Sequence, residues 1–425
     1  MRKRVRLAPH PSIHCPHRYN PPVTLRRKLA WISVLYFAEA LPFGIAYDVW
    51  PVYFRVHGVS LRDIGLMSLL SLPWTWKMLW APLVDRYGAR QHWITACLAA
   101  LGATTIAIAS QDPSQPTWLL WGLLLLFTTA SATQDIAIDA YAVDVATPQD
   151  TGTINGTRVS AGRVGLLAGG GGMIFLAGFA GWKLPWVLLA AVLVVLSAVS
   201  WASPRVRLDE AARRHALSQV LRWLLRWQML PVILFVPLYK LGDSTLGRMV
   251  KPFWVDRGYS LAEIGSISVT LGVVLTILGA LAGGWFTNRF GIFRALLWLG
   301  ITQLASNLGY VAVASLELPR ESIYLASMLE SFTQGLGTAA FLSFLMNLCD
   351  REHAATQYAI LSALFAVTRD VGGAFTGIGV EALGYTAFFA VTTALALPGL
   401  AMLPLVRGAI RGVLAGEGSD AAAGQ

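Results

Sequence analysis

The sequence predicts an all-α membrane protein of twelve transmembrane helices, arranged as two pseudo-symmetric six-helix halves. Hydrophobic residues make up 55% of the 425 residues, charged residues make up 13%, and the mean hydropathy is +0.57. Soluble domains carry roughly 25% charged residues, so the composition excludes an ordinary soluble protein. The apolar runs are continuous rather than alternating, which disfavours a transmembrane β-barrel.

A repeated segment supports the plan of two halves. The stretch Gly58–Gly65 (GVSLRDIG) returns as Gly258–Gly265 (GYSLAEIG), and Asp85–Gly88 (DRYG) returns as Asn288–Gly291 (NRFG). Each copy adjoins a long apolar run, so the repeat unit is about half of the chain and lies in the membrane. Two membrane halves with a site between them are typical of secondary transporters.

The individual spans follow from the length of the apolar runs, because crossing the hydrocarbon core takes about 20 residues per helix. In chain order we expect spans at 29–47, 62–82, 92–110, 118–142, 157–179, 184–203, 229–249, 264–286, 293–314, 322–347, 355–379 and 385–406. The first span follows a long basic leader, so we expect a working helix rather than a cleavable signal peptide.

Basic residues set the expected orientation. They concentrate in the N-terminal tail (1–28) and in the linker between the two halves (204–228), and smaller sets are Arg86 and Arg90, Arg289 and Arg294, and Arg407 and Arg411 in the C-terminal tail (407–425). With twelve spans these segments share one side of the membrane, and the positive-inside rule makes that side the cytoplasm. The net charge of +10 thus reflects topology rather than nucleic-acid binding. The two bundles are 29–203 and 229–406, and the linker is either an amphipathic surface helix or a plain connection.

Cysteine and histidine give no sign of a disulfide framework or a metal centre. Cys15, Cys97 and Cys349 are scattered, and the His/Cys tract near Cys15 lies among prolines, as in a disordered leader. We expect no metal and no cofactor, with a proton gradient as the energy source.

The loop after the second span resembles the signature loop of the major facilitator superfamily. Asp85, Arg86, Gly88 and Arg90 match its acidic, basic and glycine positions, whereas Ala81 stands where the usual glycine would be. Asp85 at a helix end can pair with basic groups of a neighbouring helix and lock one conformation, so we assign these four residues to gating.

Longer stretches resemble the AmpG-type muropeptide permeases. The matching segments are 72–82 (LPWTWKMLWAP), 134–140 (QDIAIDA), 239–243 (YKLGD), 303–310 and 355–364 (ATQYAILSAL). The likeness extends over about residues 30–406. It implies proton-driven import of anhydro-muropeptides across the bacterial inner membrane. The same branch contains acetyl-CoA transporters, so the substrate does not follow from the resemblance alone.

Charged residues inside the spans are the candidate site residues, because a charge at the bilayer centre costs about 2.5–3.5 kcal/mol on insertion scales. Asp135 and Asp139 are four residues apart and share a helix face. Such a pair of like charges favours holding a proton, so we assign both to proton coupling. For Asp139, a gate or a folding contact is the competing interpretation.

Lys240 and Asp243 are three residues apart in the seventh span, close enough to pair along one helix face. Lys240 can hold a substrate carboxylate while Asp243 takes the proton. Alternatively, the two residues form a self-neutralising ion pair. Glu39, also assigned to proton coupling, departs from the small residues that muropeptide permeases tend to have there. Glu330 is assigned to substrate binding.

The remaining candidates are polar or aromatic. Arg163 and Arg369 can anchor an anionic ligand, or pair with the acids of the fourth span as an inner gate; we assign Arg163 to gating and Arg369 to substrate binding. Gln134 and Gln357 can bond sugar or peptide groups. Trp74 can stack on a sugar ring, although a packing role competes.

The resulting hypothesis is a monomeric, proton-coupled importer of anionic sugar- or peptide-bearing solutes that works by alternating access in the bilayer. The alternatives are an exporter of drugs or metabolites and a carrier of another anion such as an acyl-CoA-like solute. A membrane-embedded transferase would need a compact catalytic cluster, which the spans lack, so we expect no enzyme. A channel would not need the repeated loops, whereas a sensor would differ only in flux.

Overall fold

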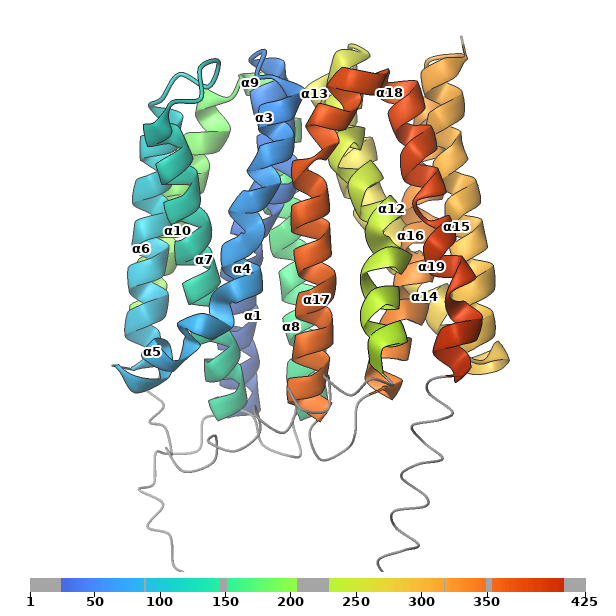
Figure 1. The fold of residues 1–425 in the computed structure, drawn as a ribbon. Coiled ribbons are helices and arrows are strands. Elements are labelled where there is room, and N and C mark those ends of the chain that lie inside the picture. The colour runs from blue at the N-terminus through green and yellow to red at the C-terminus, as the bar shows by residue number, and fades with distance from the viewer. Residues whose placement is uncertain are drawn as a thin grey trace, which may run out of the picture.

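The computed structural model describes residues 24–87, 89–145, 151–204, 229–316, 318–348 and 354–408. These residues form helices and short connections with no β-strand among them, which confirms the all-α prediction. The helices stand side by side in one bundle (Figure 1). The described chain begins and ends at the same end of the bundle, the lower end in Figure 1. We call this the terminal end and the opposite end the remote end.

Several predicted spans are built from more than one helical segment. The first half contains α1 (Leu25–Gly44), η1 (Ile45–Val49), α2 (Trp50–Val56), α3 (Leu61–Leu66), η2 (Met67–Ser71), α4 (Leu72–Trp76), η3 (Lys77–Leu79), α5 (Ala81–Arg86), α6 (Arg90–Ala109), α7 (Trp118–Val145), α8 (Thr151–Leu167), η4 (Ala168–Gly172), α9 (Met173–Ala180) and α10 (Lys183–Trp201). The second half contains α12 (Leu230–Asp256), α13 (Leu261–Glu263), η6 (Ile264–Leu271), α14 (Gly272–Phe290), α15 (Ile292–Ser315), α16 (Ser322–Asn347), α17 (Ala354–Ala374), α18 (Thr376–Ala394) and α19 (Leu397–Ala401).

In the described residues, eight helices are long and apolar enough to cross a membrane: 25–56, 90–109, 118–142, 157–180, 183–201, 261–290, 292–315 and 376–408. The predicted spans 62–82, 229–249, 322–347 and 355–379 are helical as well, but they do not meet this criterion of length and apolarity. The total of twelve spans therefore stays a prediction. The basic linker and most of both tails lie outside the described residues.

The repeated Gly-x-Ser segment encodes a turn followed by a helix start. Gly58 and Gly258 both have positive φ, 82° and 74°, a conformation that glycine adopts without steric cost. Ser60 then caps α3, since its hydroxyl accepts a hydrogen bond from the Asp63 backbone N–H at 3.1 Å. Ser260 and Glu263 form a reciprocal capping box at α13. The sequence repeat thus corresponds to the same local structure in both halves.

The two halves contact each other at the remote end. Gly377 of α18 lies against the backbone of Leu61 at the start of α3, so closely that a Cβ on Gly377 would overlap it. Arg55 of α2 forms an ion pair with Asp256 of α12, and Arg62 donates its backbone N–H to Glu381 at 2.9 Å. These contacts close the bundle at the end away from the termini.

Candidate functional site

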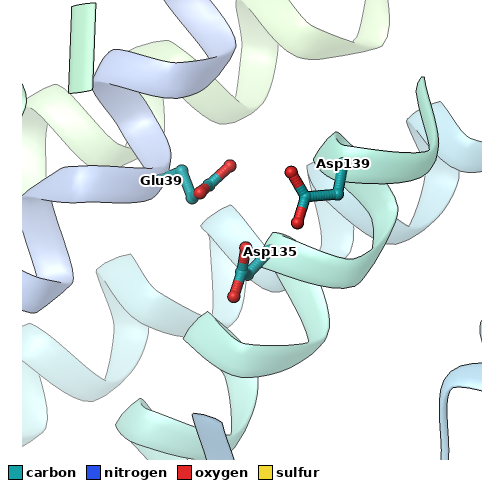
Figure 2. A group of neighbouring side chains, drawn as sticks. All are labelled: Glu39, Asp135 and Asp139. Atoms are coloured by element: carbon teal, nitrogen blue, oxygen red, sulfur yellow. The ribbon is translucent and has the colours of Figure 1, made fainter. Parts of the chain in front are cut away.

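Three carboxylates meet in the first half of the molecule. Glu39 comes from α1, and Asp135 and Asp139 come from successive turns of α7 (Figure 2). Their side chains point toward one another, and one oxygen from each lies within 4.8 Å of the others. We call these three residues the acid cluster. The structure thus brings together three of the residues that the sequence assigns to proton coupling.

Two cations and a tyrosine hold the acid cluster. Lys77 of η3 lies with its Nζ 2.5 Å from Asp135 Oδ2 and 3.8 Å from Asp139 Oδ2. Arg158 of α8 lies with its Nη2 2.5 Å from Asp139 Oδ1, and the Tyr36 hydroxyl donates to the same oxygen at 2.7 Å. The α8 arginine that pairs with the α7 acids is therefore Arg158, not Arg163.

The fourth residue assigned to proton coupling, Asp243, lies in the second half, apart from the acid cluster. It pairs with Lys240 on the same helix, α12, at 3.3 Å, and both side chains are buried. Lys240 also donates to Gln303 at 3.4 Å and to Thr338 at 3.2 Å. The sequence predicted this i,i+3 pair, and the structure adds partners from α15 and α16.

A cavity of about 340 Å³ lies between the two halves, and we call it the central cavity. Its charged lining residues are Asp48, Arg163, Lys251, Glu330 and Arg369. A second cavity of about 290 Å³ shares Lys251 and Arg369 with it and reaches Lys240 and Asp243. Arg163, Glu330 and Arg369, predicted from three different spans, thus line one cavity.

An ion pair joins the halves across the central cavity. Lys251 of α12 lies with its Nζ 3.0 Å from Asp48 Oδ1 of η1. Asp48 and Lys251 were not predicted as site residues, because each stands alone in its own helix and the pairing arises only from packing. The signal in the sequence is the presence of a charge within or beside an apolar run.

A second inter-half cluster surrounds the fully buried Asp370 of α17. Arg248 and Arg369 lie 3.3 and 3.1 Å from Asp370 Oδ1, and Thr75 of α4 donates to Oδ2 at 2.8 Å. The guanidinium carbons of both arginines lie over the Tyr47 ring, at 4.6 and 4.9 Å from its centroid. Arg369 is therefore both a cavity-lining residue and part of the contact between halves.

Trp74 and Gln134 do not line either cavity. Trp74 is 6% exposed; its ring stacks on Phe43 at 4.3 Å, and its Nε1 donates to Ser131 at 3.3 Å. Phe43 itself lines the central cavity together with Tyr47, so these two rings present the aromatic surface there. Gln134 is fully buried, and neither its amide nitrogen nor its oxygen has a hydrogen-bond partner in the described part of the chain.

The residues assigned to the signature loop are described only in part. Arg90 is 1% exposed, donates to the Val84 carbonyl at 2.9 Å and lies 3.7 Å from Asp144. Asp85 and Arg86 end α5, but their side chains lie outside the described atoms, as does that of Gln357, and Gly88 is outside the described residues. Their assigned roles stay predictions.

Comparisons with known proteins agree on one family. The sequence profile of the Major Facilitator Superfamily matches residues 29–369. The anhydromuropeptide permease of Escherichia coli K12 is 32% identical over 389 residues, which is 89% of this chain and 79% of the permease. A Rickettsia felis protein named putative transporter AmpG 4 is 28% identical over 88% of this chain and 95% of its own.

Solved structures share the fold at low sequence identity. A bacterial homolog of the human lysosomal transporter Spinster, in an inward-facing and occupied conformation, has a TM-score of 0.69 at 15% identity and covers 90% of this chain and 96% of its own. The nucleoside transporter NupG has a TM-score of 0.70 at 14% identity, covering 90% of this chain and 99% of its own.

A membrane-embedded helical bundle with charged residues around a cavity between its halves defines a secondary transporter of small molecules rather than an enzyme. It is a multi-pass protein of the inner membrane. The chain belongs to the AmpG-type permeases of the Major Facilitator Superfamily.

Proposed function

We propose that this transporter imports anhydro-muropeptide-type solutes, anions with sugar and peptide parts, together with protons. The name of the Escherichia coli relative supports the substrate class. The single observation that carries the coupling is the composition of the acid cluster. The energy source is the proton gradient, without a cofactor.

The charge balance of the acid cluster supports proton coupling. Three carboxylates face only Lys77 and Arg158 among the described residues, so full ionisation leaves one negative charge without a cationic partner. A partly buried charge without a partner is costly, and a single bound proton balances the cluster. Release of that proton toward the cytoplasm would then alter the contacts of α1, η3, α7 and α8 at once.

Transport proceeds by alternating access in this proposal. With the termini in the cytoplasm, as the distribution of basic residues predicts, the remote end faces outward and its contacts hold the outer side closed. The central cavity then exchanges solute with the cytoplasm in this conformation. Each monomer is a complete unit, because one chain supplies both the acid cluster and the cavity.

Uptake of radiolabelled anhydro-muropeptide into proteoliposomes, with and without an inward-directed proton gradient, tests the proposal. We expect wild-type protein to accumulate the solute only with the gradient. Asp135→Asn should abolish accumulation, because the two remaining carboxylates are balanced by Lys77 and Arg158 and the cluster no longer needs a proton. Asp112→Asn is the control, since Asp112 lies in the α6–α7 connection, outside both cavities. A folded Asp135→Asn protein that still accumulates solute would contradict the proton role, and a wild type without uptake would exclude the substrate.

A further inference from the structure

We propose that Arg163 binds the anionic group of the transported solute, and that this single contact makes the central cavity selective for sugar acids over neutral sugars. The inference rests on the proposed function for the kind of solute. It moves Arg163 from a gating role to a specificity-determining one.

Among the residues that the structure describes, Arg163 differs from the other cations of the two adjoining cavities in having no acid within ion-pair distance. Lys251 is paired with Asp48, Lys240 with Asp243, and Arg248 and Arg369 share Asp370. In the residues that the structure describes, no carboxylate lies within ion-pair distance of Arg163, although its side chain is exposed and lines the central cavity. Its charge is therefore available to a ligand.

A guanidinium group is well suited to that ligand. Its planar fork can donate two parallel hydrogen bonds to a carboxylate or phosphate, which fixes the orientation of the bound group. Because Arg163 lies on α8 of the first half and most of the cavity wall comes from the second half, a bound anion would touch both halves. In alternating access the two halves move relative to each other, so a solute bound to both halves can influence that movement.

The rest of the cavity wall fits an uncharged polar part. Its hydroxyl and amide side chains are Tyr47, Ser268, Thr276, Ser327, Ser331 and Gln334. Hydroxyl and amide groups donate and accept hydrogen bonds, as sugar hydroxyls and acetamido groups require. Phe43 and Tyr47 add aromatic surfaces. The class of ligand is therefore a hydroxyl-rich solute with one anionic group.

Glu330 is one of the two acids in the same wall, beside Asp48. It is 7% exposed, accepts a hydrogen bond from Gln334 at 3.4 Å and has no cation within ion-pair distance in the described part of the chain. Asp48 is occupied by Lys251 at 3.0 Å. In the described part of the chain neither acid lies within ion-pair distance of Arg163, so both leave its charge to the ligand.

Ligand-induced thermal stabilisation of the purified full chain tests the proposal, with N-acetylmuramic acid as the acidic probe and N-acetylglucosamine as its neutral counterpart. We expect wild-type protein to bind the acid at least about tenfold more tightly, the equivalent of roughly 1.4 kcal/mol. Arg163→Gln should abolish the difference, whereas Arg163→Lys should keep part of it and show that the site still folds. Arg289→Gln removes an exposed charge outside the central cavity and should leave the preference unchanged.

The outcomes separate this inference from the proposed function. A wild type that binds both sugars equally or neither, or an Arg163→Gln variant that keeps the preference, would overturn the role of Arg163. If the acid preference depends on Arg163 but wild-type proteoliposomes take up no anhydro-muropeptide, the inference stands and the proposed substrate falls. If wild-type proteoliposomes take up anhydro-muropeptide but Arg163→Gln does not change the acid preference, the proposed substrate stands and the role of Arg163 falls.

Discussion

Asp139 has several partners, so the proposed coupling depends on the charge balance of the acid cluster rather than on any single group. It accepts hydrogen bonds from Tyr36 and Arg158 and lies 3.8 Å from Lys77 Nζ. The same lysine is bonded to Asp135 at 2.5 Å. Removal of one cation therefore leaves the acid cluster with a larger net negative charge than removal of one cation together with one acid.

Arg158→Gln should lower gradient-driven uptake by about two- to fivefold, because three carboxylates would then face Lys77 alone; an ion pair with this much access to solvent contributes about 0.2–1 kcal/mol. The double variant Arg158→Gln/Asp139→Asn has two acids and one cation, so it returns to the wild-type excess of one acid. We expect it to recover folding and part of the solute exchange relative to Arg158→Gln. Thermal stability and exchange in proteoliposomes measure both effects, and purely additive losses would contradict the charge-balance account.

At the scale of one helix, the sequence was sufficient to predict much of the site. Asp135 and Asp139, or Lys240 and Asp243, share a face because their spacing follows the helical period. The repeat also predicted matching halves, and its Gly-x-Ser pattern forms the turn and cap at α3 and α13.

Contacts between helices could not be predicted in the same way. Asp48 and Lys251 meet across the two halves, and Lys77 reaches Asp135 from a different span. Sequence spacing carries no information about which helices pack together or at what depth. The assignment of Arg163 to a gate and the omission of Arg158 share this cause, since both arginines stand on α8 and only the packing of α7 distinguishes them.

Close packing of α18 against α3 gives a prediction for these elements. Gly377→Ala should push the two helices apart at the remote end, because the added Cβ would overlap the backbone of Leu61. Overpacking typically costs about 1–3 kcal/mol, enough to shift a conformational equilibrium several-fold to a hundredfold. Gly284→Ala is the matched control, since a Cβ there meets no atom within 4 Å.

Spin labels on Arg62→Cys and Leu383→Cys, both exposed side chains near this contact, report the separation of α3 and α18 by electron–electron double resonance. The native cysteines are replaced in this background. We expect a population at longer distance in Gly377→Ala and the wild-type distribution in Gly284→Ala. An unchanged distribution in both variants would show that the contact does not hold the remote end closed.

At the scale of the whole molecule, we expect the ion pair of Arg55 and Asp256 to make the balance between conformations sensitive to salt. Arg55 Nη2 lies 2.8 Å from Asp256 Oδ2, and the Tyr385 hydroxyl donates to the same oxygen at 2.7 Å. Both charged side chains are about one-fifth exposed, and pairs with this much access to solvent contribute about 0.2–1 kcal/mol and weaken with ionic strength. The pair therefore tunes closure of the remote end without locking it.

Asp256→Asn should open the remote end by a factor of about two to five, the equivalent of roughly 0.4–1 kcal/mol. Wild-type protein in about 1 M salt, where the Debye length is only about 3 Å, should approach the same distribution, measured with the spin-label pair above. The exchanged variant Arg55→Asp/Asp256→Arg should recover part of the closure at low salt, because the attraction is restored with its sign pattern reversed. Arg320→Gln removes the cation of another remote-end pair, Arg320 and Glu263 at 3.1 Å, which lies within the second half. Because that pair does not join the halves, its loss should leave the distance distribution unchanged. If Arg320→Gln and Asp256→Asn shift the distribution equally, closure depends on the total charge at the remote end and not on the ion pair between the halves.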